Sequence, residues 1–138
     1  DGLLRALDAP VAVALENKSG QAVASVNDIT RAMELMAKRD GLGIMLDVPN
    51  LWKAGKLQAR EVENMPVEHL VGLHVHERHR APSPAGMVDW GMVRRLIHRR
   101  DGLIINPEVF HHGELERTLD LIRHELLVPK PHKGAAAL

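Results

Sequence analysis

The sequence contains no cysteine, which excludes a disulfide framework, a cysteine-ligated zinc site and a thiol nucleophile. It also has no tyrosine, so only Trp52, Trp90 and Phe110 could stack on nucleic-acid bases. No apolar run approaches the length of about 18 residues that a membrane-spanning helix needs. Acidic and basic residues number 18 each, and the net charge of zero provides no general attraction to polyanions. We therefore expect neither a membrane nor a nucleic acid as partner.

The remaining composition is that of one globular domain. The chain has 138 residues, of which 45% are hydrophobic, and nine are histidines, the side chain that most often binds metals or titrates near neutral pH. No signal peptide is visible, and we expect a cytoplasmic protein. Residues 134–138 are low in complexity and typical of a vector-derived tail, so the domain is expected to cover residues 1–133.

Four short apolar runs predict buried β strands, at residues 10–15, 42–46, 67–75 and 103–107. Helical patterns alternate with them. We expect these helices to begin at the Asn27-Asp28 cap, at Asp89 and at Glu114, with a loop and a short helical piece at residues 48–65. This alternation predicts an α/β fold of parallel βα units, in which helices connect neighbouring strands.

A weak internal repeat supports the same organisation. Arg39-Asp40-Gly41-Leu42-x-Ile44 recurs as Arg100-Asp101-Gly102-Leu103-x-Ile105, at an offset of 61 residues that also relates Asp47 to Glu108. Each copy predicts the end of a helix, an Asp-Gly turn, a buried strand and an acidic residue after the strand.

Each predicted strand is followed by a polar residue that can bind a metal: Glu16, Asp47, His76 and Glu108. Successive members are about 30 residues apart, close to one βα unit. Parallel strands bring their carboxyl ends to one edge of a sheet, where α/β proteins bind ligands. Three carboxylates and one imidazole would repel one another there without a cation, and they suit Mn²⁺, Co²⁺, Mg²⁺ or Zn²⁺.

Five segments together resemble the xylose isomerase-like sugar isomerases and epimerases, which are TIM barrels. They are Val13-Ala-Leu-Glu16-Asn17, Gly43-Ile-Met-Leu-Asp47, Gly72-Leu-His74-Val-His76, Val88-Asp89-Trp90 and Ile105-Asn-Pro-Glu108. In that family, strands five to eight end in metal ligands in the order Glu, Asp, His, Glu. The resemblance implies that this chain is the C-terminal half of such a barrel, with strands five to eight.

The resemblance also implies an activity. Glu16, Asp47, His76 and Glu108 would hold one divalent metal, which would bind a sugar or a related small hydroxy-ketone. Glu16 and Glu108 would be the catalytic pair, in which one removes a proton to form an enediolate and the other returns one. The expected function is that of a metal-dependent isomerase or epimerase.

The choice between His74 and His76 as metal ligand stays open, because residues i and i+2 of a strand face the same way. We favour His76, which is nearer the strand end, and expect His74 to lie deeper, in the core or against the substrate. In such families an arginine after the metal histidine often binds substrate, and Arg80 stands six residues after His74. Asn50 occupies a position where many members have histidine, so it could hydrogen-bond a substrate but could not shuttle a proton.

Four strands are half of a barrel, which needs eight strands. The two sheet edges would expose unpaired backbone groups, so we expect a missing N-terminal half or a second copy of the chain to complete the structure. Two other functions remain possible at this point. One is a non-catalytic metal-binding or dimerisation half-barrel, and the other is a phosphodiester hydrolase resembling the barrel endonucleases, which need two or three metals.

Overall fold

The computed structural model describes residues 13–37, 41–53, 59–83 and 85–127. The predicted tail at 134–138, the domain boundary at residue 133 and the first residues of the strand expected at 10–15 lie outside these ranges.

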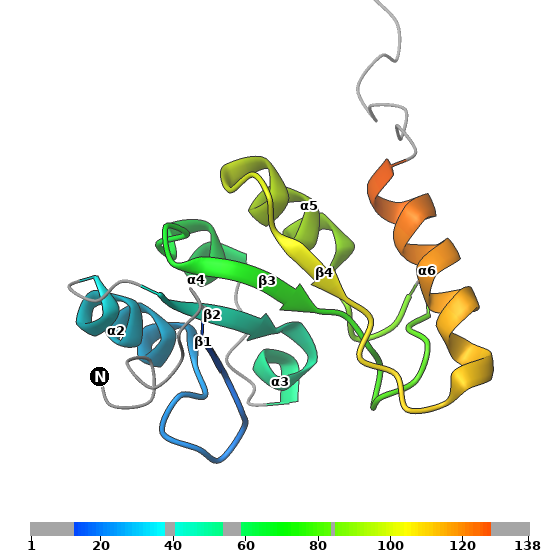
Figure 1. Ribbon diagram of the computed structural model, residues 1–138, viewed down its shortest axis with the longest axis horizontal. Helices are drawn as coiled ribbons and strands as arrows, with labels where there is room; N and C mark the ends of the chain where they lie inside the picture. Colours follow the sequence, from blue (N-terminus) through cyan, green and yellow to red (C-terminus); the bar gives the residue numbers. More distant parts are fainter. Residues whose placement is uncertain (1–12, 38–40, 54–58, 84, 128–138) are drawn as a thin grey trace, which may run out of the picture.

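The described strands form one parallel sheet in the order β1-β2-β3-β4 (Figure 1). The strands are β1 (Val13–Glu16), β2 (Leu42–Asp47), β3 (Leu70–His74) and β4 (Ile104–Asn106). Parallel neighbours that follow one another in the sequence need a crossover between them, and helices supply each crossover. The predicted α/β fold of parallel βα units is confirmed.

Helices occupy the connections between the strands and follow the last strand. They are α2 (Val26–Met36), α3 (Val48–Lys53), α4 (Ala59–Asn64), α5 (Trp90–Arg99) and α6 (His112–Leu127). The main core lies between the sheet and helices α2, α4 and α5, where residues such as Ile29, Leu46 and Leu96 are fully buried. In the described part of the chain, no helix combines the length and the apolar character that crossing a bilayer requires.

Helix α6 is less well covered than the other long helices. Only Thr118 and Glu125 of its 16 residues are buried, and its apolar residues Ile122 and Leu126 are only partly buried against the core. Figure 1 shows α6 beyond the β4 edge of the sheet, apart from the helices that cover the core. The apolar face of α6 is therefore only half covered by the described part of the chain.

The helix starts differ in part from the predicted ones. The Asn27-Asp28 cap is wrong, because Ser25 is the N-cap of α2 and its Oγ accepts the Asp28 backbone N–H. The Asp28 carboxylate accepts the Ser25 backbone N–H in return, at 2.9 Å, which makes a capping box. Asp28 therefore lies within the first turn of α2, where its side chain accepts a hydrogen bond from the capping residue Ser25. The predicted cap of α5 at Asp89 is confirmed, since its carboxylate accepts the Met92 N–H.

The register of the sheet decides which side chains lie level at its carboxyl edge. Asp47 of β2 pairs with His74 of β3, and His74 pairs with Asn106 of β4. Strand β3 ends at His74, before the end predicted from the apolar run at 67–75. His76 therefore lies beyond the strand, where the alternation of strand side chains no longer sets its direction.

Candidate metal centre

Asn17 joins the end of β1 to the end of β2. Its side-chain Nδ2 donates to the carbonyl oxygen of Asp47 at 3.0 Å, and its Oδ1 accepts the Asp47 backbone N–H at 2.7 Å. Asn17 is fully buried, and Asp47 is 1% exposed. These two bonds satisfy both backbone groups of Asp47 and hold the residue at the edge of the sheet.

Asn50 holds the carboxylate of the same residue. Its backbone N–H donates to Asp47 Oδ1 and its side-chain Nδ2 donates to Oδ2, each at 2.7 Å. The Nδ2 group also donates to the carbonyl oxygen of Asn17 at 3.2 Å. Because Asp47 directly precedes α3, its carboxylate accepts from the helix start in the manner of an N-cap. The amide hydrogens of Asn50 are thus engaged within the protein.

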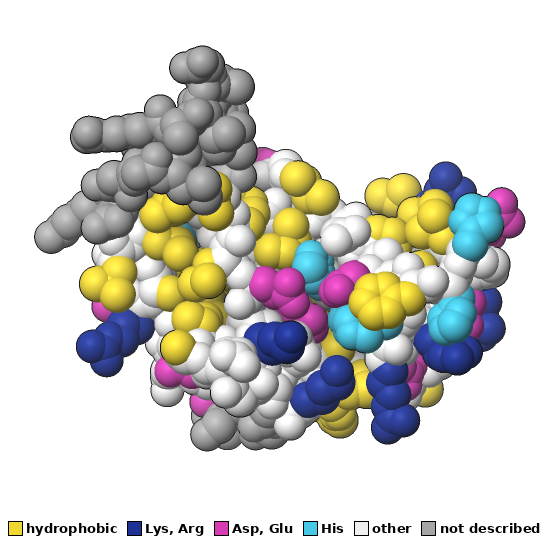
Figure 2. All heavy atoms as spheres, turned by 60° about the horizontal axis from the view of Figure 1, so that its bottom comes forward, with side chains coloured by type: hydrophobic (Ala, Val, Ile, Leu, Met, Phe, Trp, Pro, Cys, Tyr) yellow, Lys and Arg dark blue, Asp and Glu magenta, His cyan; other side chains and the backbone are white. Residues whose placement is uncertain are grey.

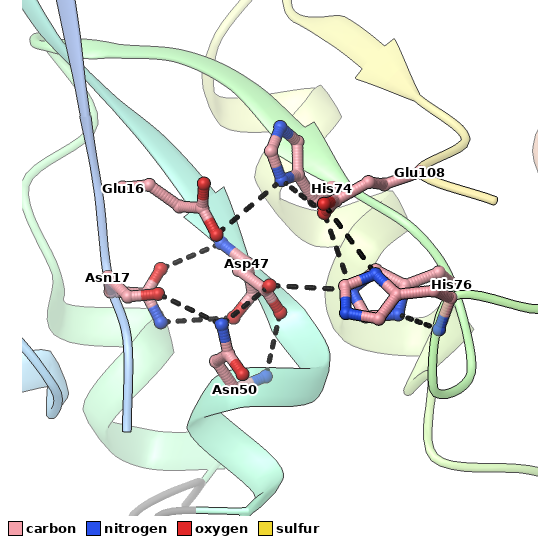
Figure 3. A network of polar contacts seen from close by, with 8 residues as sticks. Glu16, Asn17, Asp47, Asn50, His74, His76 and Glu108 are labelled. Atoms are coloured by element: carbon pink, nitrogen blue, oxygen red, sulfur yellow. Dashed lines mark hydrogen bonds and ion pairs between the residues drawn. The ribbon is translucent and has the colours of Figure 1, made fainter. Parts of the chain in front are cut away.

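Three more side chains meet Asp47 at this edge (Figure 3). His74 Nδ1 lies 2.9 Å from Glu108 Oε2 and 3.9 Å from Glu16 Oε1. One ligand atom from each of Glu16, Asp47, His74 and Glu108 can be chosen so that all lie within 4.8 Å of one another. Figure 2 shows acidic and histidine side chains gathered on one face of the molecule, beside hydrophobic side chains.

Two atoms of this cluster lack the hydrogen bonds that burial normally demands. His74 Nδ1 and Glu108 Oε2 are buried and neither makes a hydrogen bond, although they are only 2.9 Å apart. Unsatisfied buried polar atoms are uncommon and require an explanation. Ligand atoms that converge on a common cation, rather than on each other, would have this geometry. Three carboxylates and one imidazole fit a divalent cation.

A second group, His76, His79 and Glu108, also lies within metal-binding distances. The His76 and His79 rings, however, are stacked, with centroids 4.5 Å apart and an angle of 12° between their planes. An imidazole binds a metal through a lone pair in the plane of its ring, and two nearly parallel stacked planes do not share such a point. In this arrangement the two histidines do not bind one ion together.

The environment of Glu16 changes the acidity of its carboxyl group. Partial burial raises the pKa of Glu16, and the nearby Asp47 and Glu108 carboxylates raise it further, while His74 acts in the opposite direction. Without a cation, the carboxyl group of Glu16 is therefore a weaker acid than a free glutamate side chain. A bound cation would act against this crowding of negative charge.

The loops that follow β3 and β4 are fastened together next to the cluster. The Phe110 backbone N–H donates to the carbonyl oxygen of His79 at 3.0 Å, and the two rings stack with centroids 4.2 Å apart. His79 and Arg78 both have left-handed backbone angles, with φ of 59° and 53°. Reciprocal backbone hydrogen bonds between Glu77 and Arg80 close this tight turn. The turn places His79 Nδ1 3.6 Å from Glu108 Oε1.

A comparison with models of protein families identifies the family of this chain. The family described as the xylose isomerase-like TIM barrel matches residues 3–130. The chain belongs to this family. The resemblance drawn from the five sequence segments is thereby confirmed.

Solved structures with a similar fold include two proteins named as epimerases. The 3-keto-D-glucoside 4-epimerase of E. coli aligns over 83% of this chain and 45% of its own, with a TM-score of 0.60 and 13% identity. D-psicose 3-epimerase, in a structure with D-fructose, aligns over 91% of this chain and 43% of its own, with a TM-score of 0.56 and 14% identity. This member of the xylose isomerase-like family thus spans less than half the length of either protein. No curated protein sequence matched.

The structure brings Glu16, Asp47 and Glu108 together, and the histidine that shares a possible ligand position with all three is His74. His76 Nε2 lies beside two of them, 3.3 Å from Asp47 Oδ2 and 3.6 Å from Glu108 Oε2. His76 is fully buried behind Asp47, whereas the His74 side chain is 12% exposed. The predicted order of depth is therefore wrong, because β3 ends at His74 and the loop residue His76 is the more deeply buried of the two. Arg80 is 62% exposed, and its guanidinium group lies 3.4 Å from Glu114 Oε1 of α6.

Sequence reasoning missed two residues of the site. Asn17 directly follows Glu16, and this position next to a predicted strand end was the only signal for it in the sequence. His79 lies in a polar loop without hydrophobic periodicity, so nothing in the sequence separated it from a solvent-exposed histidine.

We predict that Asn17→Ala destabilises the protein by about 2–4 kcal/mol, because it leaves two buried backbone groups of Asp47 without partners. Urea unfolding measures the change. Asn64→Ala at the exposed end of α4 is the control, expected to stay within about 0.5 kcal/mol of wild type. Equal effects of the two substitutions would contradict the role of Asn17.

The raised pKa of Glu16 predicts a pH-dependent stability difference in metal-free protein. Ionised Glu16 is disfavoured by folding, so its cost appears as the pH rises above the ordinary glutamate pKa and is complete above the folded-state pKa. Glu16→Gln should therefore stabilise metal-free protein at pH 7, by less than about 1 kcal/mol because the side chain is 41% exposed. Urea unfolding with a chelator at pH 4–7 should show this gain shrinking toward acid. A gain independent of pH, or a loss at pH 7, would refute it.

Proposed function

We propose that this chain is the C-terminal half, with strands five to eight, of a metal-dependent isomerase or epimerase barrel that acts on a sugar or a related hydroxy-ketone. One observation carries the proposal: Glu16, Asp47, His74 and Glu108 converge at the carboxyl ends of four successive parallel strands. Their order along the chain, Glu-Asp-His-Glu, is the order that the family resemblance implies. The similar folds of two proteins named as sugar epimerases support the substrate class.

In this proposal His74 replaces His76 as the metal ligand. Its Nδ1 lies near both glutamates, and its ring is level with Asp47 across the β2–β3 pair. Arg80 then stands six residues after the ligand, the spacing expected for a substrate-binding arginine. Its backbone lies in the turn that flanks the centre, and its side chain is 62% exposed, so it could approach a substrate by leaving the Glu114 carboxylate. Asn50 acts on Asp47 instead of on the substrate.

The two glutamates divide the acid–base work. A bound divalent ion, Mn²⁺, Co²⁺, Mg²⁺ or Zn²⁺, would polarise the carbonyl and hydroxyl oxygens of the substrate. Glu16 comes from β1 and Glu108 from the end of β4, so they reach the centre from the two outer strands of the sheet. One carboxylate takes the proton from the carbon beside the carbonyl and leaves an enediolate. The other, which starts protonated, returns its proton to the opposite face and ends ionised.

The proposal requires a partner that completes the barrel, either an N-terminal half or a second copy of the chain. Leu15 on β1 and Ile104 on β4 are exposed at the two edge strands, at 39% and 61%. A cavity of about 320 Å³ lies between α5, β4 and α6, with mostly apolar walls that include Ile97, Ile105 and Ile122. Such open apolar surfaces are costly in water and suit contact with further βα units.

We predict that chelator-treated protein binds one Mn²⁺ per chain and that His74→Gln weakens the affinity at least about tenfold, because it removes the one nitrogen donor of the centre. Isothermal titration calorimetry measures both. His124→Gln on the exposed face of α6 is the matched control and should bind as wild type does. Equal affinities of the His74 variant and wild type would eliminate this centre.

We predict that the barrel, in the assembly that completes it, exchanges hydrogen for deuterium beside the carbonyl of a ketose in heavy water. Glu16→Gln and Glu108→Gln should each slow the conversion of the ketose to its isomer or epimer in heavy water at least about 100-fold, because that conversion uses both proton-transfer groups. Nuclear magnetic resonance of a ketose panel reports the rate, and Glu116→Gln on exposed α6 is the control. Unchanged rates in both variants would end the acid–base assignment. Metal binding without exchange in wild type would favour the non-catalytic half-barrel.

A further inference from the structure

We infer that His76 is a positioning residue, whose Nε2–H orients the Asp47 carboxylate and thereby raises the affinity of the centre for its cation. This inference rests on the proposed metal centre. His76 is fully buried, and its Nε2 lies 3.3 Å from Asp47 Oδ2. It touches the carboxylate from the side of the β3–α5 loop, whereas Asn50 touches it from the start of α3.

A backbone contact sets the tautomer of the His76 ring. The His79 backbone N–H donates to His76 Nδ1 at 3.0 Å, so Nδ1 is the acceptor of the neutral ring. The proton of that ring is then on Nε2, which donates it to Asp47. Neither nitrogen keeps a free lone pair for a metal, so His76 serves the centre through Asp47.

The turn that follows His76 keeps this ring in place. Arg78 and His79 adopt left-handed backbone angles, which cost energy for residues other than glycine and occur at functional sites more often than elsewhere. The turn directs the His79 N–H at His76 and lays the His79 ring between those of His76 and Phe110, with interplanar angles of 12° and 5°. His76 is thereby restrained along its edge and across its face.

The acceptor sites of Asp47 show why this donor matters. A carboxylate offers about four lone-pair directions. Oδ1 accepts the Asn50 backbone N–H, while Oδ2 accepts the Asn50 side-chain amide and faces His76 Nε2. The remaining direction is available to the centre, where ligand atoms of Glu16, His74 and Glu108 lie close by. Removing the His76 donor would leave one direction of a buried carboxylate unsatisfied and its orientation less well defined.

Two substitutions separate this role from packing. Gln places its amide nitrogen near the position of His Nε2, so His76→Gln keeps a donor for Asp47. Asn places its amide near the position of Nδ1, so His76→Asn keeps a group beside the His79 N–H and loses the donor to Asp47. Both variants replace a buried imidazole with a primary amide, which makes them matched controls for the loss of the ring.

Calorimetric titration of chelator-treated full chain with Mn²⁺ tests the inference. His76→Asn should raise the Kd about 10- to 100-fold, and His76→Gln should restore most of the affinity. Equal weakening of both variants, or no weakening of His76→Asn while His74→Gln binds poorly, would overturn the inference and leave the metal centre standing. Absence of Mn²⁺ binding in wild type would overturn both. If His76→Asn does not fold by circular dichroism, His76→Gln decides alone: a loss greater than about tenfold overturns the inference.

Discussion

The burial of one carboxylate, that of Asp47, is the constraint on which this site depends. A buried carboxylate is costly unless donors surround it, and here the end of β1, the start of α3 and the loop after β3 all contribute to holding the residue. The same contacts connect the ends of neighbouring strands. The arrangement that fixes the direction of the carboxylate is therefore also part of what holds the carboxyl edge of the sheet together.

The outer members of the cluster are held less firmly than its centre. Glu16 and Glu108 extend from the two edge strands and are more exposed than Asp47, and partial burial, together with the neighbouring carboxylates, raises the pKa of Glu16. A group that transfers a proton must reach the substrate from the open side of the centre, whereas buried hydrogen-bond donors fix the direction of the carboxylate that would hold the cation. The gradient of burial across the cluster agrees with the division of roles that we propose. Edge strands of a half-barrel would also become interior strands once further βα units are added, which would enclose both glutamates.

Much of the fold follows from short-range patterns. The apolar runs and the Asp-Gly turns predicted the parallel βα units, because strands buried on both faces need no polar alternation and helical crossovers need about 30 residues per unit. The start of α2 was misplaced by a few residues because Ser25 and Asp28 form a reciprocal capping box, in which either residue alone resembles an N-cap. Boundaries of this kind depend on hydrogen bonds that compete locally, and a single sequence does not rank them.

The identity of the ligand-type residues Glu16, Asp47 and Glu108 was readable from the chain alone, since each ends an apolar run and parallel strands must bring such ends to one edge. The sequence did not decide between His74 and His76 as the ligand, because residues two apart in a strand face the same way. The choice depends on where β3 ends, which places His74 in the strand and His76 beyond it. That point is set by pairing with β2 and β4 and by the turn at 77–80, both of which depend on contacts between distant segments. Likewise, the partners of Asp47 come from positions 17, 50 and 76, and only packing of three separate connections brings them to the same carboxylate.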